Sequence, residues 1–132
     1  MANIINFSDA ASIGLHSMIL IAKSDKPLNA IELSKQLGNS KHHIGKVLQR
    51  LVKDGLLSSY RGPTGGFTIS VDPKEVTLYE VYESIEGKSN IKLCSFDSHF
   101  CPTDKCIRKN LIKRLSDEFI SYMTSQKLSD YL

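Results

Sequence analysis

The sequence contains no long hydrophobic run. Its apolar stretch at residues 18–22 is far too short to cross a lipid bilayer. Residues 1–9 include no basic segment followed by a long apolar one, which a signal peptide would need. Internal repeats and low-complexity segments are absent as well. We therefore expect a cytoplasmic protein that has no membrane partner.

Cysteine is scarce, and its arrangement argues against two common uses. The three cysteines, Cys94, Cys101 and Cys106, are an odd number in a reducing compartment, which argues against a disulfide framework. None of them forms the C-x-x-C pair typical of a structural zinc site. His99 lies close by, but no acyl-transfer or redox motif surrounds it. We therefore expect neither an enzyme nor a small-molecule substrate.

The composition is that of an ordinary folded domain. Of the 132 residues, 41% are apolar and 23% are charged, which indicates one domain, or one domain with an appendage, around a modest core. The net charge of +3 permits nucleic-acid binding but does not require it. The position of the charges along the chain therefore matters more than their sum.

Two consecutive helices are expected between residues 29 and 54. Asn29 can cap the first helix, with Glu32 at the capping-box position, and Gly38 can end it. Ser40 can cap the second helix, whose opposite face is polar and basic. Its core-facing stripe consists of Ile44, Val47, Leu48, Leu51 and Val52. Two helices joined by so short a link are a helix-turn-helix pattern.

A β-hairpin is expected directly after these helices. Residues 56–60 and 67–71 are strand candidates, and the glycine-rich segment 62–66 between them suits a turn with positive φ angles. Such a hairpin is the wing of a winged helix-turn-helix. Further helices are expected at residues 9–22, capped by Ser8 or Asp9, and at residues 78–86, capped by Thr77.

A long amphipathic helix is expected from about residue 104 to residue 125. Its apolar stripe consists of Leu111, Leu115, Phe119 and Tyr122, flanked by Ile112, Ile120 and Met123. Since the winged-helix unit already covers its own core, we expect this helix to form a homodimer contact. The alternative is that it packs back on its own domain.

The predicted fold is therefore mainly α with a small β-hairpin wing. It comprises a winged helix-turn-helix DNA-binding domain at residues 1–88, and a cysteine loop with a long C-terminal dimerisation helix at residues 89–132.

The polar face of the second helix and the wing supply candidate DNA contacts. In a winged helix-turn-helix, the second helix of the motif enters the major groove and its first residues reach base edges. Lysine suits guanine, and an arginine on the wing suits phosphate or a narrow minor groove. The candidate residues are Ser40, Lys41, His42, His43, Lys46, Arg50, Arg61 and Thr64. The alternative is a basic face that is merely solvated.

The adjacent His42 and His43 point about a third of a turn apart on a helix, so we expect no shared metal ion. One of them should pack beside the turn while the other faces DNA.

The three clustered cysteines are candidate metal ligands. Thiolates are soft ligands that suit iron–sulfur clusters and zinc. Three of them on one loop could bind one cluster, with a fourth ligand from elsewhere. The alternative is three unrelated cysteines, but their clustering in a polar loop favours a shared site.

The chain resembles the Rrf-type (IscR/NsrR) family of winged-helix transcription regulators over nearly its whole length. The most specific segment is GLLSSYRGPTGGFTIS, residues 55–70, which is similar to the family's G-L-V-x-S-x-R-G-x-x-G-G-Y/F wing. LQRLVKDGL before it and VTLYEVYESIEG after it fit as well. Three cysteines before a long helix match the branch that carries a cluster.

The resemblance implies a homodimeric regulator, with repression as the expected mode, that reads operator DNA. It also implies a [2Fe-2S] or [4Fe-4S] iron–sulfur cluster held by Cys94, Cys101 and Cys106. In such regulators, loss or nitrosylation of the cluster changes DNA binding. We hypothesise that the two helices over residues 40–53 enter successive major grooves of a palindromic operator.

The fourth ligand varies within the family. One branch uses a histidine three residues after the last cysteine, but Lys109 occupies that position here and cannot serve. The branch similar to NsrR uses an aspartate early in the first helix, supplied by the partner subunit. The segment INFSDAA matches Asp9 to that position, although Asp9 also suits a plain first-turn acid. His99 is a weaker candidate.

The cysteine spacing departs from the family pattern. Six and then four residues separate the cysteines here, instead of about five and five. The type of cluster is therefore open, and an apo or zinc-bound form is an alternative. Two further alternatives are a clusterless regulator that senses oxidants through its thiols and a winged-helix interaction module that does not bind DNA.

Overall fold

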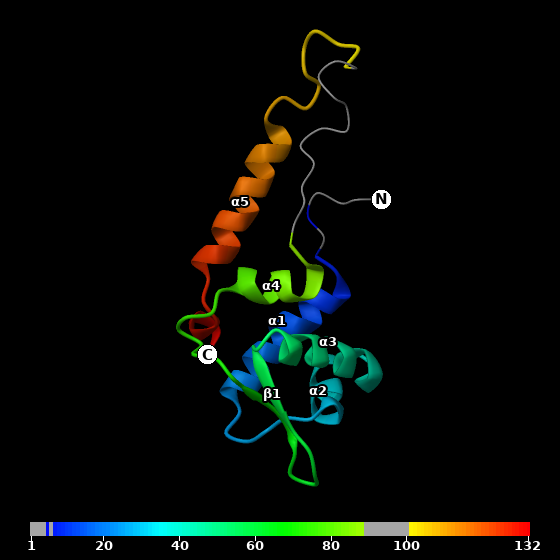
Figure 1. Ribbon diagram of the computed structural model, residues 1–132, viewed down its shortest axis with the longest axis vertical. Helices are drawn as coiled ribbons and strands as arrows, with labels where there is room; N and C mark the ends of the chain where they lie inside the picture. Colours follow the sequence, from blue (N-terminus) through cyan, green and yellow to red (C-terminus); the bar gives the residue numbers. More distant parts are fainter. Residues whose placement is uncertain (1–4, 6, 89–100) are drawn as a thin grey trace.

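Five α-helices and one β-hairpin follow one another along residues 5, 7–88 and 101–132, the part of the chain that the computed structural model describes. The elements are α1 (Asp9–Lys23), α2 (Ala30–Leu37), α3 (Lys41–Lys53), β1 (Leu57–Tyr60), β2 (Gly66–Ile69), α4 (Leu78–Glu86) and α5 (Leu111–Ser125), with a final 3-10 turn at Leu128–Tyr131. Helices α1–α4 and the hairpin form one body, and α5 extends away from it (Figure 1). The prediction of a mainly α, winged-helix fold is confirmed.

None of the helices in these described ranges is long and apolar enough to cross a membrane.

The predicted helix caps are confirmed at the start of the first four helices. In each case a side-chain oxygen accepts a hydrogen bond of 2.8 to 3.1 Å from the backbone N–H three residues later. The capping residues are Ser8, Asn29, Ser40 and Thr77. A cap of this kind stabilises a helix by about 1 kcal/mol, because it satisfies an N–H that has no partner within the helix.

Helix α1 is the centre of the core. It packs against α2, α3, α4 and β2, and it buries residues on most of its circumference. The predicted stripe of α3 faces it, with Ile44, Leu48 and Leu51 fully buried. This packing fixes which side of α3 remains outside, so the polar side of α3 is presented to solvent.

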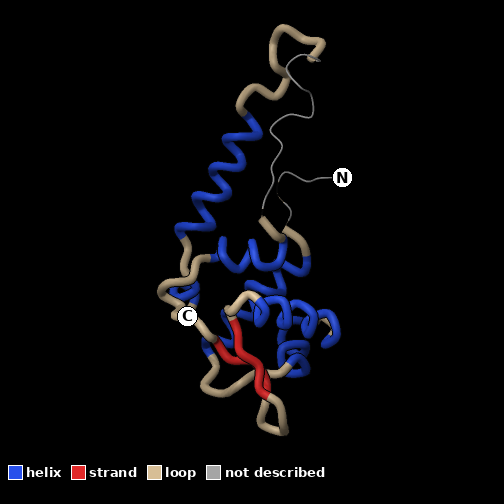
Figure 2. Tube along the Cα trace, viewed as in Figure 1, coloured by secondary structure: helices blue, strands red, loops and turns tan. Residues whose placement is uncertain are grey.

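The wing is joined to the helix-turn-helix by backbone hydrogen bonds. Strands β1 and β2 pair antiparallel, and β2 also pairs with the segment before α2 (Figure 2). There the Phe67 N–H donates to the Leu28 carbonyl at 2.8 Å, and the Leu28 N–H donates back at 3.2 Å. At Gly66 a Cβ atom would lie 2.7 Å from the Leu28 carbonyl, so this approach requires glycine.

Helix α5 starts later than predicted. It begins at Leu111 and not near Asp104, because Lys109 has a left-handed conformation (φ +49°) that interrupts a helix. Residues 101–110 are all exposed, so no core packing holds them in a helix. The predicted start was therefore too early, because this segment has no core surface to pack against.

The apolar stripe predicted on α5 divides into two sides. Phe119 packs edge-on against Tyr82 of α4, with 5.1 Å between ring centres, and Met123 is buried. In contrast, Leu111, Leu115 and Tyr122 are 45%, 40% and 56% exposed. Helix α5 therefore packs back on its own domain with one side and leaves a second apolar side open.

Candidate nucleic-acid interface and cysteine site

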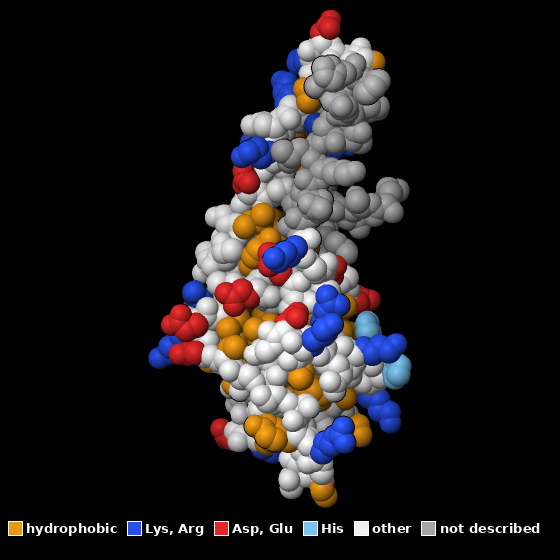
Figure 3. Space-filling model, in the orientation of Figure 1, with side chains coloured by type: hydrophobic (Ala, Val, Ile, Leu, Met, Phe, Trp, Pro, Cys, Tyr) orange, Lys and Arg blue, Asp and Glu red, His pale blue; other side chains and the backbone are white. Residues whose placement is uncertain are grey.

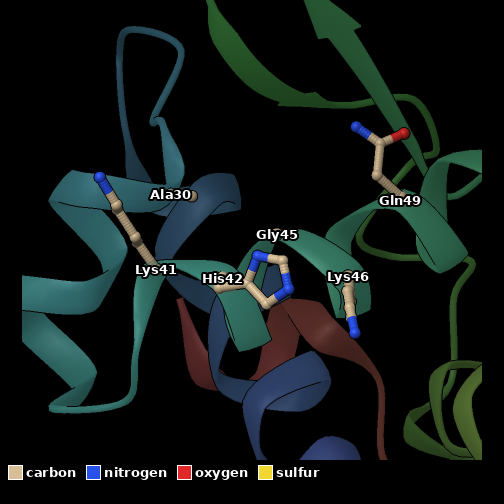
Figure 4. A pocket seen from close by; sticks show the side chains of 6 residues that line it. All are labelled: Ala30, Lys41, His42, Gly45, Lys46 and Gln49. Carbon is tan, nitrogen blue, oxygen red and sulfur yellow. The ribbon is translucent and has the colours of Figure 1, made fainter.

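The outer side of α3 forms an open groove. The groove has a volume of about 550 Å³ and is lined by Ala30, Lys41, His42, Gly45, Lys46 and Gln49, and we call it the α3 groove. Lys41, Gly45 and Gln49 follow one another at four-residue steps along one side of the helix. Figure 4 shows Lys41 and His42 on one side of Gly45, and Lys46 and Gln49 on the other. Three of the predicted contact residues thus meet at one surface.

Three residues of the groove were not predicted from the sequence. Gln49 lies on the polar face but was not selected, although its step of four residues from Gly45 could have indicated it. Ala30 belongs to α2, so the periodicity of α3 carries no sign of it. Gly45 was not among the candidate contacts either, and as a glycine it contributes no side chain to the groove.

The other residues at the start of α3 have different roles. The Ser40 hydroxyl accepts the His43 N–H at 3.1 Å, which makes it the helix cap. Both His42 and His43 are exposed, so the expectation that one packs beside the turn is wrong. The core-facing position at this end of α3 is Ile44, which is buried.

Arg50 points away from the α3 groove. Its Nε donates to the Ser84 carbonyl at 2.9 Å, and the Ser84 hydroxyl donates to Asp54 Oδ2 at 2.6 Å. These bonds connect the last turn of α3 with the last turns of α4. A DNA contact by Arg50 stays a prediction, while the structure gives its side chain a role between two helices.

The tip of the wing carries Arg61 and Thr64, both exposed. A turn closed by the Gly65 N–H to Gly62 carbonyl bond at 3.0 Å holds the tip. The hairpin projects from the body at the end opposite to residues 101–110 (Figure 1). Lys, Arg and His side chains gather along one side of the body, over α3, whereas acidic side chains gather on the other side of the same view (Figure 3).

Two of the cysteines lie in the described part of the chain, and both are suited to bind a metal. Cys101 and Cys106 are exposed free thiols. The hydrogen bond from the Thr103 side chain, with 3.5 Å between Oγ1 and Sγ, and then the Thr103 backbone lower the pKa of the Cys101 thiol. A lower pKa favours the thiolate, which is the form that binds soft metals. Cys94 and His99 lie outside the described residues.

Asp9 is the first residue of α1, and it is exposed. The cap role belongs to Ser8, whose hydroxyl also donates to Glu86 at the end of α4. Asp9 lines a hollow of about 260 Å³ together with His16 and Asn39. Within residues 5, 7–88 and 101–132, no three His, Cys, Asp or Glu side chains are grouped to hold a metal ion. The two described thiols and Asp9 are therefore not brought together inside one chain.

Comparison with known proteins gives consistent results. The profile of the Rrf2 family, described as iron-dependent transcriptional regulators, matches residues 7–132. The chain is 27% identical over 118 residues to the HTH-type transcriptional regulator IscR of Photorhabdus laumondii, which covers 89% of this chain and 68% of that protein. The matched stretches span between 64% and 68% of the length of such IscR relatives.

Two solved structures show the same fold. CymR, the global cysteine regulator of B. subtilis, superimposes with a TM-score of 0.75 at 23% identity and covers 96% of this chain and 95% of its own. IscR of T. potens superimposes with a TM-score of 0.75 at 20% identity, and the match covers 96% of this chain and 85% of that one.

Proposed function

Because the chain belongs to the Rrf2 family of transcription regulators, we propose that it is a homodimeric repressor that recognises a palindromic operator through α3 and the wing. The observation that carries this proposal is the α3 groove, where two lysines, a histidine and a glutamine surround an open surface on the second helix of the motif. Since its partner is DNA, we place the protein in the cytoplasm.

The groove residues match the chemistry of the major groove. Lys41 and Lys46 can donate to guanine O6 and N7 or to phosphate, and Gln49 can pair with adenine N6 and N7. The wing extends the contact to the neighbouring minor groove or backbone through Arg61 and Thr64. The backbone pairing of Leu28 with Phe67 ties the wing to the start of α2, so both contacts are held in a fixed arrangement before DNA binds.

Selection from a pool of random DNA duplexes tests the proposal. We expect enrichment of an inverted repeat whose half-sites lie about one helical turn apart, since a two-fold dimer presents two α3 helices. Replacing Lys41 and Lys46 by glutamine should weaken binding at least about tenfold and lower the salt slope by about 0.9 for each phosphate that is no longer neutralised. Lys113→Gln is the matched control, because Lys113 lies on α5 and pairs with Asp117. If no duplex is enriched, the winged fold serves another partner.

The open apolar side of α5 supports the homodimer. Leu111, Leu115 and Tyr122 lie on one side of the helix and are exposed in the single chain. An apolar surface on a long helix is typical of a subunit contact. We propose that a second copy covers it, with the two α5 helices packed together.

Replacing Leu115 and Tyr122 by glutamate is expected to convert the dimer to a monomer in analytical ultracentrifugation. Burying an unpaired carboxylate is strongly unfavourable, and a cost of about 3 kcal/mol would weaken the dimer roughly a hundredfold. Thr124→Glu adds a single carboxylate on the opposite side of α5, where Thr124 is exposed, and should leave the dimer intact. A dimer that survives the double substitution would place the contact elsewhere.

We propose that Cys94, Cys101 and Cys106 hold an iron–sulfur cluster, with Asp9 of the partner subunit as the fourth ligand. The exposed free thiols, the lowered pKa of Cys101 and the carboxylate left free by the Ser8 cap support this donor set. When bound, such a cluster supplies sensitivity to oxidants, nitric oxide or iron supply.

A clusterless, thiol-dependent regulator is the second candidate. It is favoured by the exposure and lowered pKa of Cys101 and by the structural likeness to CymR. Both candidates use the same cysteines, and iron and sulfide content separates them.

The end of α4 is suited to connect the cysteines with the DNA-binding surface. It stands directly before the segment that leads to them. Its Glu86 contacts the cap of α1, and its Ser84 is bonded to Arg50 and Asp54 at the end of α3. A displacement of the last turn of α4 would therefore shift both α1 and α3. We propose that the cysteine site changes DNA affinity by displacing this turn.

A further inference from the structure

Gly45 lies in the middle of α3, and no contact in the described part of the chain explains why a glycine occupies this position. Glycine is among the least favourable residues for a helix interior, because it loses more conformational freedom than alanine. Apart from the backbone of its own helix, a Cβ atom at Gly45 would meet no atom within 4 Å in the described part of the molecule. By contrast, a Cβ at Gly66 would collide with the backbone of Leu28. Packing within the protein thus explains Gly66 but does not explain Gly45.

The missing side chain has a clear effect on the outer surface. Gly45 lies at the centre of the α3 groove, and Ala30 of α2 is the other small residue that lines it. Lys41, His42, Lys46 and Gln49 are longer and surround this centre (Figure 4). The groove therefore has a small, apolar centre with a polar and cationic rim.

On the basis of the proposed DNA binding, we infer that Gly45 is a specificity-determining position that accommodates the C5-methyl group of a thymine. Among the four bases, only thymine presents a methyl group in the major groove. A base amine or carbonyl placed on the apolar centre would lose its hydrogen bond to water without a replacement. The absence of a Cβ lets the α3 backbone come close enough for the methyl group to fill the centre, while the rim contacts neighbouring bases and phosphates.

Gly45→Ala is expected to stabilise the fold but to weaken operator binding. Gly45→Ala should raise the melting temperature by a few degrees, because alanine is the better helix former and meets nothing in the free protein. The same methyl group occupies the place of the thymine methyl, so operator affinity should fall about tenfold or more. Thr124→Ala on the exposed side of α5 is the control, since it improves helix propensity away from DNA and should leave affinity unchanged.

Uracil substitution identifies the occupant. In the selected operator, each thymine is replaced in turn by uracil, which removes only the methyl group. For the unmodified protein, one position in each half-site should lose about three- to fivefold in affinity, as expected for one buried methyl group. For Gly45→Ala, uracil at that position should cause no loss, because the two methyl groups compete for one space.

The outcomes separate this inference from the proposed function. If the protein retains operator DNA but no uracil substitution weakens binding, the thymine site is refuted and DNA binding stands. If Gly45→Ala binds as tightly as the unmodified protein, the close approach at Gly45 is refuted. Should the alanine variant fold poorly, the uracil series on the unmodified protein alone decides. If no duplex is retained at all, the proposed function itself fails.

Discussion

Arg61→Ala is expected to weaken operator binding about a hundredfold. Arg61 follows β1 directly at the tip of a wing whose backbone is tied to Leu28, so the position of its backbone is fixed before DNA is bound. It is exposed, and no acidic group in the described ranges pairs with it. A loss of about 1.4 kcal/mol for each wing is a tenfold change, and a dimer has two wings.

Fluorescence anisotropy with the selected operator, at several salt concentrations, measures this effect. If Arg61 binds phosphate, the slope of log affinity against log salt should also fall by about 0.9 for each phosphate that it neutralises. Arg61→Lys should be intermediate, because lysine keeps the charge but lacks the planar group with several donors. Lys74→Ala removes one positive charge from an exposed loop outside the wing and should change little. Unaltered binding by Arg61→Ala would remove the wing from the interface.

Replacement of Cys94, Cys101 and Cys106 by alanine is expected to abolish visible absorption after anaerobic reconstitution with iron and sulfide. The absorption of an iron–sulfur cluster depends on its thiolate ligands, and these three are the cysteines of the chain. Because Cys101 and Cys106 are exposed, their removal leaves no cavity in the core. The melting temperature of the cluster-free protein should therefore stay unchanged when Cys101 and Cys106 alone are replaced by alanine.

Iron and sulfide counts on the unmodified protein distinguish the candidates. A cluster gives equal amounts of both, zinc gives metal without sulfide, and a thiol sensor gives neither. The variant without cysteines should bind operator DNA as the cluster-free protein does, whatever the oxidant or nitric oxide added. Visible absorption that persists in this variant would end the cluster proposal, and a response to oxidants that persists would end the thiol alternative.

Local chemistry made most of the DNA-binding domain predictable. Ser40 and Asn29 cap helices whose apolar steps face the core, and both signals lie within a few residues of the structure that they determine. The glycines of the wing were predicted equally well. At Gly66 the Leu28 backbone comes so close that only a residue without a Cβ atom fits. Helix caps, apolar steps and turn glycines act over a few residues, and each of them stabilises the native fold independently. Predictions that rest on them therefore agree with the final fold.

The features that the sequence did not reveal depend mostly on contacts between residues that are distant along the chain. Arg50 lies on the polar side of α3 and its DNA contact stays a prediction, but its bond to Ser84 joins two different helices, and no periodicity within α3 reveals that bond. Ala30 reaches the α3 groove from another helix for the same reason. The start of α5 was misplaced because residues 104–110 have no surface to pack against, which the sequence pattern does not reveal.

The attachment of the wing has a consequence for how such a regulator can acquire new targets. Leu28 and Phe67 are joined through main-chain atoms, and the tip beyond them carries no core residue. The outer positions of α3 are likewise separate from the stripe that holds the helix in place. Substitutions at residues 41, 42, 46, 49, 61 and 64 should therefore have little effect on folding stability, so the proposed recognition can diverge by point substitutions while the scaffold is inherited intact.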